Sequence, residues 1–256
     1  MRRNRTSETS AGRGRNDRAV SDVLAFTLVF ATIIGSVMLL SMTGFQAMAD
    51  YSDNEQLRNS ERAMEALTEN FNDIMRHDGI DKRRGELSLQ EGTFSTGSDG
   101  TELTIEIDSN SADASPTTLG ELTYTTGSDT IAYEGGGIVR SAENGGSVVL
   151  KRPQLTCDPT NETAMITLTS IETDSRSIQS SGTLEVTMNE LNRETQIESD
   201  VNEVTITADT DYDNAWNTTL DRSGWETESY PDATCTSDAG NQLRVVITVV
   251  EADIEY

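Results

Sequence analysis

Histidine, lysine and cysteine are scarce in this 256-residue chain, which has one histidine, His77, and only two cysteines. The single histidine lies far along the sequence from both cysteines, which disfavours a zinc site, and no Ser/His/Asp or Cys/His catalytic arrangement can be identified from the sequence. Carboxylates are so numerous that their proximity in the sequence says nothing about a catalytic pair. The sequence therefore predicts a protein that is not an enzyme and that uses neither a metal nor a cofactor.

Basic residues are also scarce beyond the first 18 positions. The remaining chain holds 13 of the 19 basic residues and 42 of the 44 acidic ones, a net charge of −29. A surface of this charge excludes nucleic-acid binding through phosphate neutralisation. It suits concentrated brine, because a Debye length of about 3 Å in molar salt screens the repulsion between carboxylates. An ordinary acidic surface protein is the alternative.

Charge is absent from the 27 positions between Val23 and Ala49. As a helix this run would be about 40 Å long, whereas the hydrocarbon core of a membrane is about 30 Å thick. Six arginines lie among the first 18 residues, and short basic flanks of this kind stay on the cytoplasmic side. The sequence predicts a single-pass membrane protein whose N-terminus is cytoplasmic and whose chain after Ala49 is extracellular.

Helix breakers are missing from the same region. No proline occurs in the first 115 residues, and no glycine lies between Phe45 and Asp78. Past the uncharged run, apolar residues recur three, four or seven positions apart, which is the spacing of one helical face: Leu57, Met64, Leu67, Phe71, Ile74 and Met75. One helix is therefore expected from about Val20 to Arg76, and Asp78-Gly79 supplies its stop signal.

From Glu86 onward the apolar period falls to two, with threonine at many intervening positions and glycine-rich turns between the runs. A short helix is expected at Tyr212–Arg222, where Trp216 and Leu220 lie four apart. Strands are expected at Leu87–Leu89, Leu103–Ile107, Leu122–Tyr124, Ile131–Tyr133, Val148–Leu150, Ala164–Thr169, Leu184–Met188, Val204–Thr207 and Arg244–Glu251. The predicted fold class is α+β: a long N-terminal helix, transmembrane and then amphipathic, followed by an antiparallel β-rich head resembling a sandwich.

These patterns divide the chain into four parts. Residues 1–19 form a basic, disordered leader, and residues 20–49 form the transmembrane helix. Residues 50–78 form an amphipathic extension of that helix, and residues 79–256 form an extracellular β-rich domain.

Two kinds of covalent modification are expected in the extracellular part. Cys157 and Cys235 are an even pair on the oxidising side of the membrane, which favours a disulfide; two unrelated buried thiols are the alternative. Asn161-Glu162-Thr163 and Asn217-Thr218-Thr219 match the N-glycosylation pattern, so Asn161 and Asn217 are candidate acceptors.

The segment Arg18-Ala19-Val20-Ser21-Asp22-Val23-Leu24, followed by the apolar run, resembles the class III signal of archaeal type IV pilins. The resemblance implies that a membrane prepilin peptidase cleaves between Ala19 and Val20, with Arg18 as the basic residue that precedes the cleavage site. Cleavage there leaves the apolar helix on the mature protein. It also implies that pilus assembly machinery draws the helix into a filament of like or unlike subunits. Asp22 stands where halophilic members usually have proline, and Leu24 stands where bacterial pilins have glutamate.

Two other fates of the N-terminus remain open at this point. Ala47-Met48-Ala49 before Asp50 satisfies the small-x-small rule of secretory cleavage, although the apolar run is longer than a secretory signal requires. An uncleaved signal anchor would instead hold the head at the membrane as an extracellular binding protein of the cell envelope. The sequence favours a pilin-like, membrane-anchored surface subunit with a structural, assembly or adhesion role.

Overall fold

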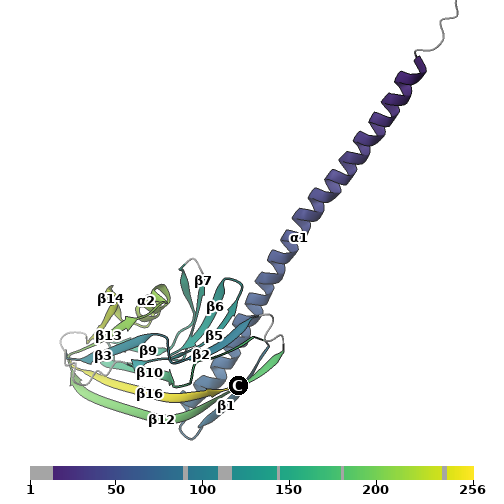
Figure 1. The fold of residues 1–256 in the computed structure, drawn as a ribbon. Coiled ribbons are helices and arrows are strands. Elements are labelled where there is room, and N and C mark those ends of the chain that lie inside the picture. Colours follow the sequence, from purple (N-terminus) through teal and green to yellow (C-terminus); the bar gives the residue numbers. More distant parts are fainter. Residues whose placement is uncertain (1–13, 89–91, 109–116, 143–144, 180–181, 238–240) are drawn as a thin grey trace, which may run out of the picture. The chain divides into compact units, whose positions relative to one another are not determined.

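In a computed structural model, the described residues are 14–88, 92–108, 117–142, 145–179, 182–237 and 241–256. Helix α1 runs from Gly14 to Arg76 (Figure 1). Its end matches the predicted residue, whereas it begins six residues before the expected Val20, because no helix breaker lies between Gly14 and Val20. The final residues of the expected leader are therefore helical, and residues 1–13 lie outside the described part.

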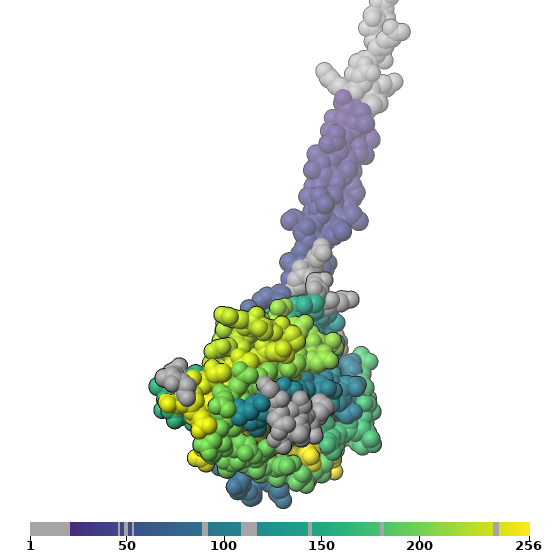
Figure 2. Space-filling view, turned by 90° about the vertical axis from the view of Figure 1, so that its left-hand side faces the viewer, coloured from purple at the N-terminus to yellow at the C-terminus, as the bar shows by residue number. Residues whose placement is uncertain are grey.

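The chain divides into two compact units, Met1–Asn54 and Glu55–Tyr256. The first unit contains the apolar half of α1, whose side chains from Ser21 to Phe45 are all exposed. Figure 2 draws the atoms of this stretch in purple. The second unit, called the head below, contains the amphipathic half of α1 together with all strands.

Three sheets and a short helix make up the rest of the head (Figure 1). Sheet I has the order β1 (Lys82–Ser88), β12 (Thr183–Val201), β16 (Leu243–Glu255), β10 (Thr163–Ile171) and β9 (Gln154–Asp158). Sheet II has the order β11 (Arg176–Gln179), β2 (Thr93–Gly97), β5 (Glu121–Thr126), β6 (Asp129–Glu134), β7 (Gly137–Ala142) and β8 (Ser147–Lys151). Sheet III has the order β14 (Glu226–Ser229), β15 (Asp232–Thr236), β13 (Glu203–Asp209), β3 (Glu102–Ile107) and β4 (Thr117–Thr118).

The predicted α+β class is confirmed: an N-terminal helix is followed by a β-rich head. Helix α2 (Asp213–Arg222) confirms the expected short helix, and both Trp216 and Leu220 are buried on it. Each expected strand falls on an observed one, except that Leu89 lies outside the described residues.

One strand pair departs from the expected antiparallel arrangement. Strands β10 and β16 run parallel over nine residue pairs, from Thr163 opposite Arg244 to Ile171 opposite Ala252. The two strands are far apart in the sequence, so no hairpin turn dictates that they run in opposite directions.

Two apolar cores hold the head together. One lies where sheet I meets sheet III and α2, and strand β10 contributes Ala164, Ile166 and Leu168 to it, all fully buried. The other lies where sheets I and II meet the amphipathic half of α1. That half of the helix contributes fully or almost fully buried side chains, Met64, Leu67, Phe71, Ile74 and Met75.

Candidate functional site

The apolar half of α1 is the first candidate site. Ser21–Phe45 is a continuous run of 25 helical residues, none of them buried, that is long and apolar enough to cross a membrane. At about 1.5 Å per residue it measures about 38 Å, more than the hydrocarbon thickness of about 30 Å. None of this apolar surface is buried within the described chain, so the segment is compatible with a membrane anchor.

Four hydroxyl groups of this segment form hydrogen bonds within the helix. Thr32 Oγ1 donates to the carbonyl of Leu28 (2.8 Å), and Ser36 Oγ donates to the carbonyl of Ile33 (2.8 Å). Thr27 and Thr43 also donate to main-chain carbonyls one turn earlier. These four side chains need no water as a partner, which suits a segment surrounded by hydrocarbon.

The expected processing residues, Arg18, Ala19 and Val20, lie within α1. Their side chains lie outside the described part, so cleavage between Ala19 and Val20 stays a prediction. The secretory alternative at Ala49 and Asp50 also falls inside this helix.

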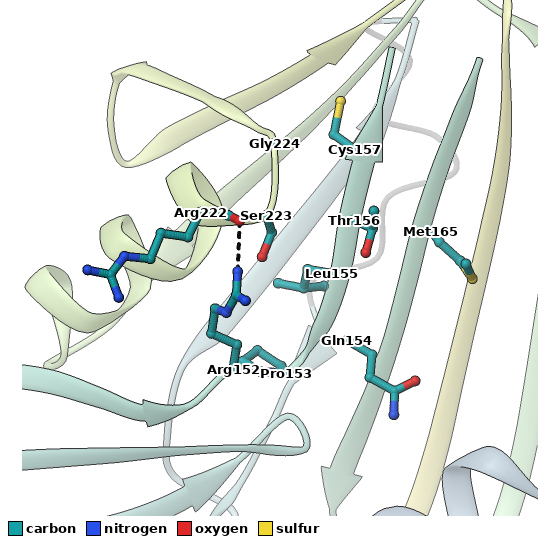
Figure 3. Close-up of a pocket in the computed structure, with 10 residues that line it drawn as sticks. All are labelled: Arg152, Pro153, Gln154, Leu155, Thr156, Cys157, Met165, Arg222, Ser223 and Gly224. Atoms are coloured by element: carbon teal, nitrogen blue, oxygen red, sulfur yellow. Dashed lines mark hydrogen bonds between the residues drawn. The ribbon is translucent and has the colours of Figure 1, made fainter. Parts of the chain in front are cut away.

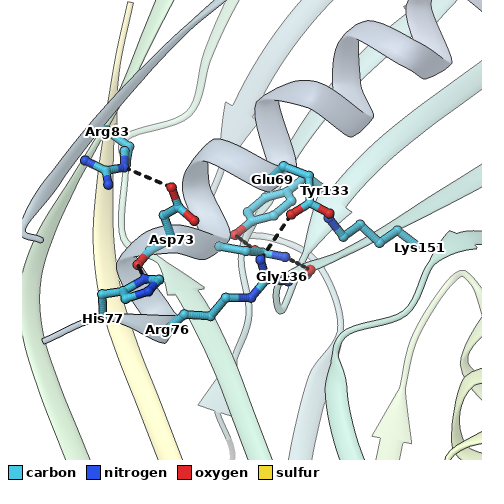
Figure 4. A network of polar contacts seen from close by, with 9 residues as sticks. Glu69, Asp73, Arg76, His77, Arg83, Tyr133, Gly136 and Lys151 are labelled. Atoms are coloured by element: carbon cyan, nitrogen blue, oxygen red, sulfur yellow. Dashed lines mark hydrogen bonds and ion pairs between the residues drawn. The ribbon is translucent and has the colours of Figure 1, made fainter.

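The amphipathic half of α1, residues 55–76, is called the stem below. Polar contacts as well as its apolar face hold the stem in the head. Asn72 is buried, and its Nδ2 donates to the carbonyl of Gly136 (2.8 Å). Tyr133 donates its hydroxyl to Asn72 Oδ1 (3.4 Å), and burial raises the pKa of this phenol well above its usual value (Figure 4). Gly136 has φ +90°, and a Cβ there would lie 2.5 Å from Met75 Cε, so glycine permits the helix and turn to approach closely.

Two ion pairs connect the stem to adjacent strands of sheet II. Arg140 on β7 pairs with Glu61 (2.5 Å), and Lys151 on β8 pairs with Glu69. The Lys151 hydrogen bond, followed by that of Arg76, lowers the pKa of Glu69 (Figure 4). Basic residues are few in the head, and Arg140 and Lys151 both pair with the stem. Exposed pairs of this kind each contribute at most about 1 kcal/mol to the free energy of unfolding.

Arg193 on β12 binds the C-terminal end of the stem. Its guanidinium donates to the carbonyls of Ile74 (2.6 Å) and Met75 (3.2 Å). It also forms two hydrogen bonds with the carboxylate of Glu190, at 3.1 and 2.8 Å, and these raise the pKa of Arg193. A cation at this position satisfies orphan carbonyls and complements the negative end of the helix dipole.

We predict that Arg193→Ala lowers the free energy of unfolding by about 2 to 3 kcal/mol, because Glu190 and two helix carbonyls lose their donor. Denaturant unfolding of the full chain in detergent measures the change. Arg84→Ala is the matched control, since Arg84 and Glu185 lie 3.6 Å apart and are each 61% exposed. Arg84→Ala should lower the free energy of unfolding by less than about 1 kcal/mol. Equal losses for both variants would contradict this role of Arg193.

Glu134 is the most buried carboxyl group among the described residues of the head. It accepts hydrogen bonds from Trp216 Nε1 (2.5 Å), Thr101 Oγ1 (2.8 Å) and Thr101 N (3.1 Å). Burial raises its pKa, while the Trp216 and Thr101 donors act in the opposite direction. These donors come from α2 and from the residue before β3, so Glu134 on β6 connects α2, β3 and β6. These contacts give Glu134 a structural role.

Metal ligands are not gathered anywhere in the described residues: no group of three or more His, Cys, Asp and Glu side chains is placed to hold an ion. The open hollow lined by Asp99, Glu121 and Tyr212 is acidic, and Tyr212 donates its hydroxyl to Glu121 (3.0 Å). Burial raises the pKa of Glu121.

Cys157 on β9 and Cys235 on β15 form a disulfide, with a Cα–Cα distance of 5.8 Å. Both residues are buried in the core between sheets I and III. The bond therefore joins the edge strand of sheet I to sheet III.

The two candidate glycosylation sites differ in accessibility. Asn161 is exposed in the turn between β9 and β10, where its Nδ2 donates to Asp158 Oδ2 (2.7 Å). Asn217 is half-buried within α2, and Thr219 of its acceptor pattern is 2% exposed. Since an acceptor must be reached at a surface loop, Asn161 is the better placed of the two in the folded protein.

One known protein family matches nearly the whole length of α1 and the head. A family of unknown function, DUF7289, matches residues 18–255. The chain belongs to this family. The comparisons with curated proteins and with solved structures gave no match. The DUF7289 match begins at Arg18, so it covers α1 from the expected processing site onward and the head as far as Glu255, and it leaves out residues 1–17 and Tyr256.

Some important residues of this DUF7289 chain were not identified from its sequence. Asn72, Arg193 and Glu134 acquire their roles through contacts with distant parts of the chain. The only available signal was for Asn72, a polar residue on the apolar side of the stem beside Phe71. Arg193 and Glu134 looked like ordinary members of a charged strand surface.

Proposed function

We propose that this DUF7289 chain is a type IV pilin-like subunit of an archaeal, salt-adapted cell surface, with a structural rather than catalytic role. The observation that carries the proposal is the division of α1 into a bare apolar half and a stem buried in the head. Removal of the basic leader after Ala19 would leave both halves on one mature polypeptide.

Assembly follows from the chemistry of the apolar segment. Once the arginines are removed, the segment carries only Asp22 near its new N-terminus, where the helix dipole favours a carboxylate. Within lipid, close packing rather than hydrophobic burial drives helix association, and small residues allow it. Gly35 and Gly44 offer such places, since a Cβ at either would meet no atom of the described chain within 4 Å. Pilus machinery would then withdraw the helices from the membrane into a filament.

The head is proposed to be extracellular and adapted to concentrated salt. A disulfide belongs outside the cytoplasm, and the basic residues 1–18 would remain inside. Asn161 is the proposed glycan acceptor. All but three of the acidic residues after residue 18 belong to the head, so the head depends on salt to screen its self-repulsion.

The N-terminus of the mature protein tests this function. We predict that intact-mass and peptide analysis of the membrane fraction gives Val20 as the first residue. Replacing Ala19 by Phe should retain the leader, because the resemblance implies a small residue before the cleaved bond. As the control, replacing both Ala47 and Ala49 by Leu removes the small-x-small pattern and should leave Val20 as the first residue.

The other outcomes identify the competing functions. A wild-type chain that keeps its basic leader would indicate a signal-anchored envelope protein and contradict the proposal. A soluble chain beginning at Asp50 would indicate a secreted domain and contradict it equally.

A further inference from the structure

One face of sheet I is only partly covered by the stem. Val250, Ala252 and Ile254 on β16 are buried in the core that contains the stem, and Thr169 on β10 donates its hydroxyl to Met75 Sδ (2.8 Å). Side chains two apart along a strand share a face, so the same face continues beyond the end of the stem. There it carries half-buried or exposed residues.

The register of four strands aligns these residues in two rows. Met165 lies opposite Thr156 and Val246, and Val246 lies opposite Ile197. We call these two rows the open face, and each is ordered here from β9 through β10 and β16 to β12. The first row is Thr156, Met165, Val246 and Ile197. The second row is Gln154, Thr167, Thr248 and Thr195.

Neither row of the open face has a charged member, although the chain beyond residue 18 contains 42 acidic residues. The next row along the same face, away from the stem, carries Asp158, Thr163 and Arg244, so charged residues border the open face at that end. Met165 and Ile197 are 47% and 53% exposed, which places both among the exposed large hydrophobic residues of the head. Thr195 and Thr248 satisfy one another across strands through their hydroxyl groups (3.2 Å). An uncharged, partly apolar surface within such an acidic protein is typical of a contact surface.

A hollow extends the open face past edge strand β9. It has a volume of about 640 Å³ and is lined by Gln154, Thr156 and Met165 together with Arg152 and the residues that follow α2 (Figure 3). Arg152 Nη1 donates to the carbonyl of Arg222 (2.7 Å), so this border is fixed by a hydrogen bond. The open face therefore ends in a recess with no described carboxylate in its lining.

We propose that the open face binds the apolar segment Ser21–Phe45 of a second copy of this chain. The same face of sheet I already holds a helix, the stem, so a helical occupant continues an existing mode of packing. The apolar segment is a fully exposed helical surface without a partner in the described chain, and it is uncharged from Val23 onward. Matching two uncharged surfaces avoids desolvating a carboxylate.

This contact is heterologous, because the head of one copy binds a different part of the next copy. Such a contact propagates without closing and generates a filament when its rotation does not return to the start. The inference therefore rests on the proposed function and deepens it by assigning a head surface to subunit contact.

A photo-crosslinking residue at position 197 tests the contact in the full chain, in cells or isolated filaments. The expected product is a covalent dimer whose crosslink maps to residues 21–45 of the second copy. The same residue at position 148 is the matched control, since Val148 is another exposed strand residue (44%), on β8 of sheet II. Absence of the dimer, or crosslinks from position 197 to lipid, another protein or a second head, would overturn the proposal.

Charged variants provide a second measurement. Ile197→Glu and Met165→Glu should lower the assembled fraction by about tenfold or more, since each buries a carboxylate in an apolar contact, whereas Val148→Glu should not. Circular dichroism checks that each variant folds. If Ile197→Glu is cleaved to Val20 and assembles normally, the open-face contact is wrong while the pilin-like function stands. If wild type is neither cleaved nor assembled, the proposed function itself fails.

Discussion

A head that begins at Glu55 is expected to fold without the rest of α1, whereas one that begins at Ile80 is not. The shorter fragment lacks the stem and with it five buried apolar side chains, Met64, Leu67, Phe71, Ile74 and Met75. At about 2 kcal/mol for each side chain, their burial contributes about 10 kcal/mol. This is comparable to the entire stability of a typical domain, roughly 5–15 kcal/mol. Circular dichroism and thermal unfolding in concentrated salt measure the difference.

Point variants of the full chain separate loss of the stem from other effects of truncation. Phe71→Ala should cost about 3 to 5 kcal/mol, since the ring is fully buried and packs edge-on against Tyr133. Glu65→Ala, on the exposed side of the stem, should change stability by less than about 0.5 kcal/mol. A cooperatively folded fragment beginning at Ile80 would show that the stem is an attachment to the head and not part of its core.

Removing the disulfide is expected to lower the free energy of unfolding by about 4 kcal/mol, because the bond closes a long loop in the unfolded chain. The double variant Cys157→Ala and Cys235→Ala tests this by denaturant unfolding, and the sequence separation of the cysteines is 78 residues. Reduction of the wild-type protein is the control and should produce a similar loss. A change below about 1 kcal/mol in both experiments would contradict a stabilising role for this link between sheets I and III.

The long helix and most strands could be predicted because their signals are local. The absence of proline and the apolar spacing placed the end of α1 at Arg76, and alternation identified strands such as β10 and β16. Seven strands were not predicted: β2, β4, β7, β9, β11, β14 and β15. The glycine-rich stretch before β7 was expected to form only a turn, whereas β7 already begins at Gly137, and β9 directly follows Pro153.

Long-range features could not be predicted from one sequence. The parallel pairing of β10 with β16 depends on the arrangement of the whole sheet and has no local signal. The open face is likewise created by register, which brings Met165 and Ile197 from strands β10 and β12 into one row. The alternating pattern alone could not distinguish which part of that face the stem covers.

The composition of surface filaments tests the central claim most directly. Filaments sheared from cells in concentrated salt and purified by density centrifugation can be analysed by intact mass and peptide mapping. We predict that they contain this chain as a subunit that begins at Val20 and retains the peptide Ser21–Phe45. Recovery of the chain only from the membrane, with its arginine-rich leader attached and no filament containing it, would contradict the account.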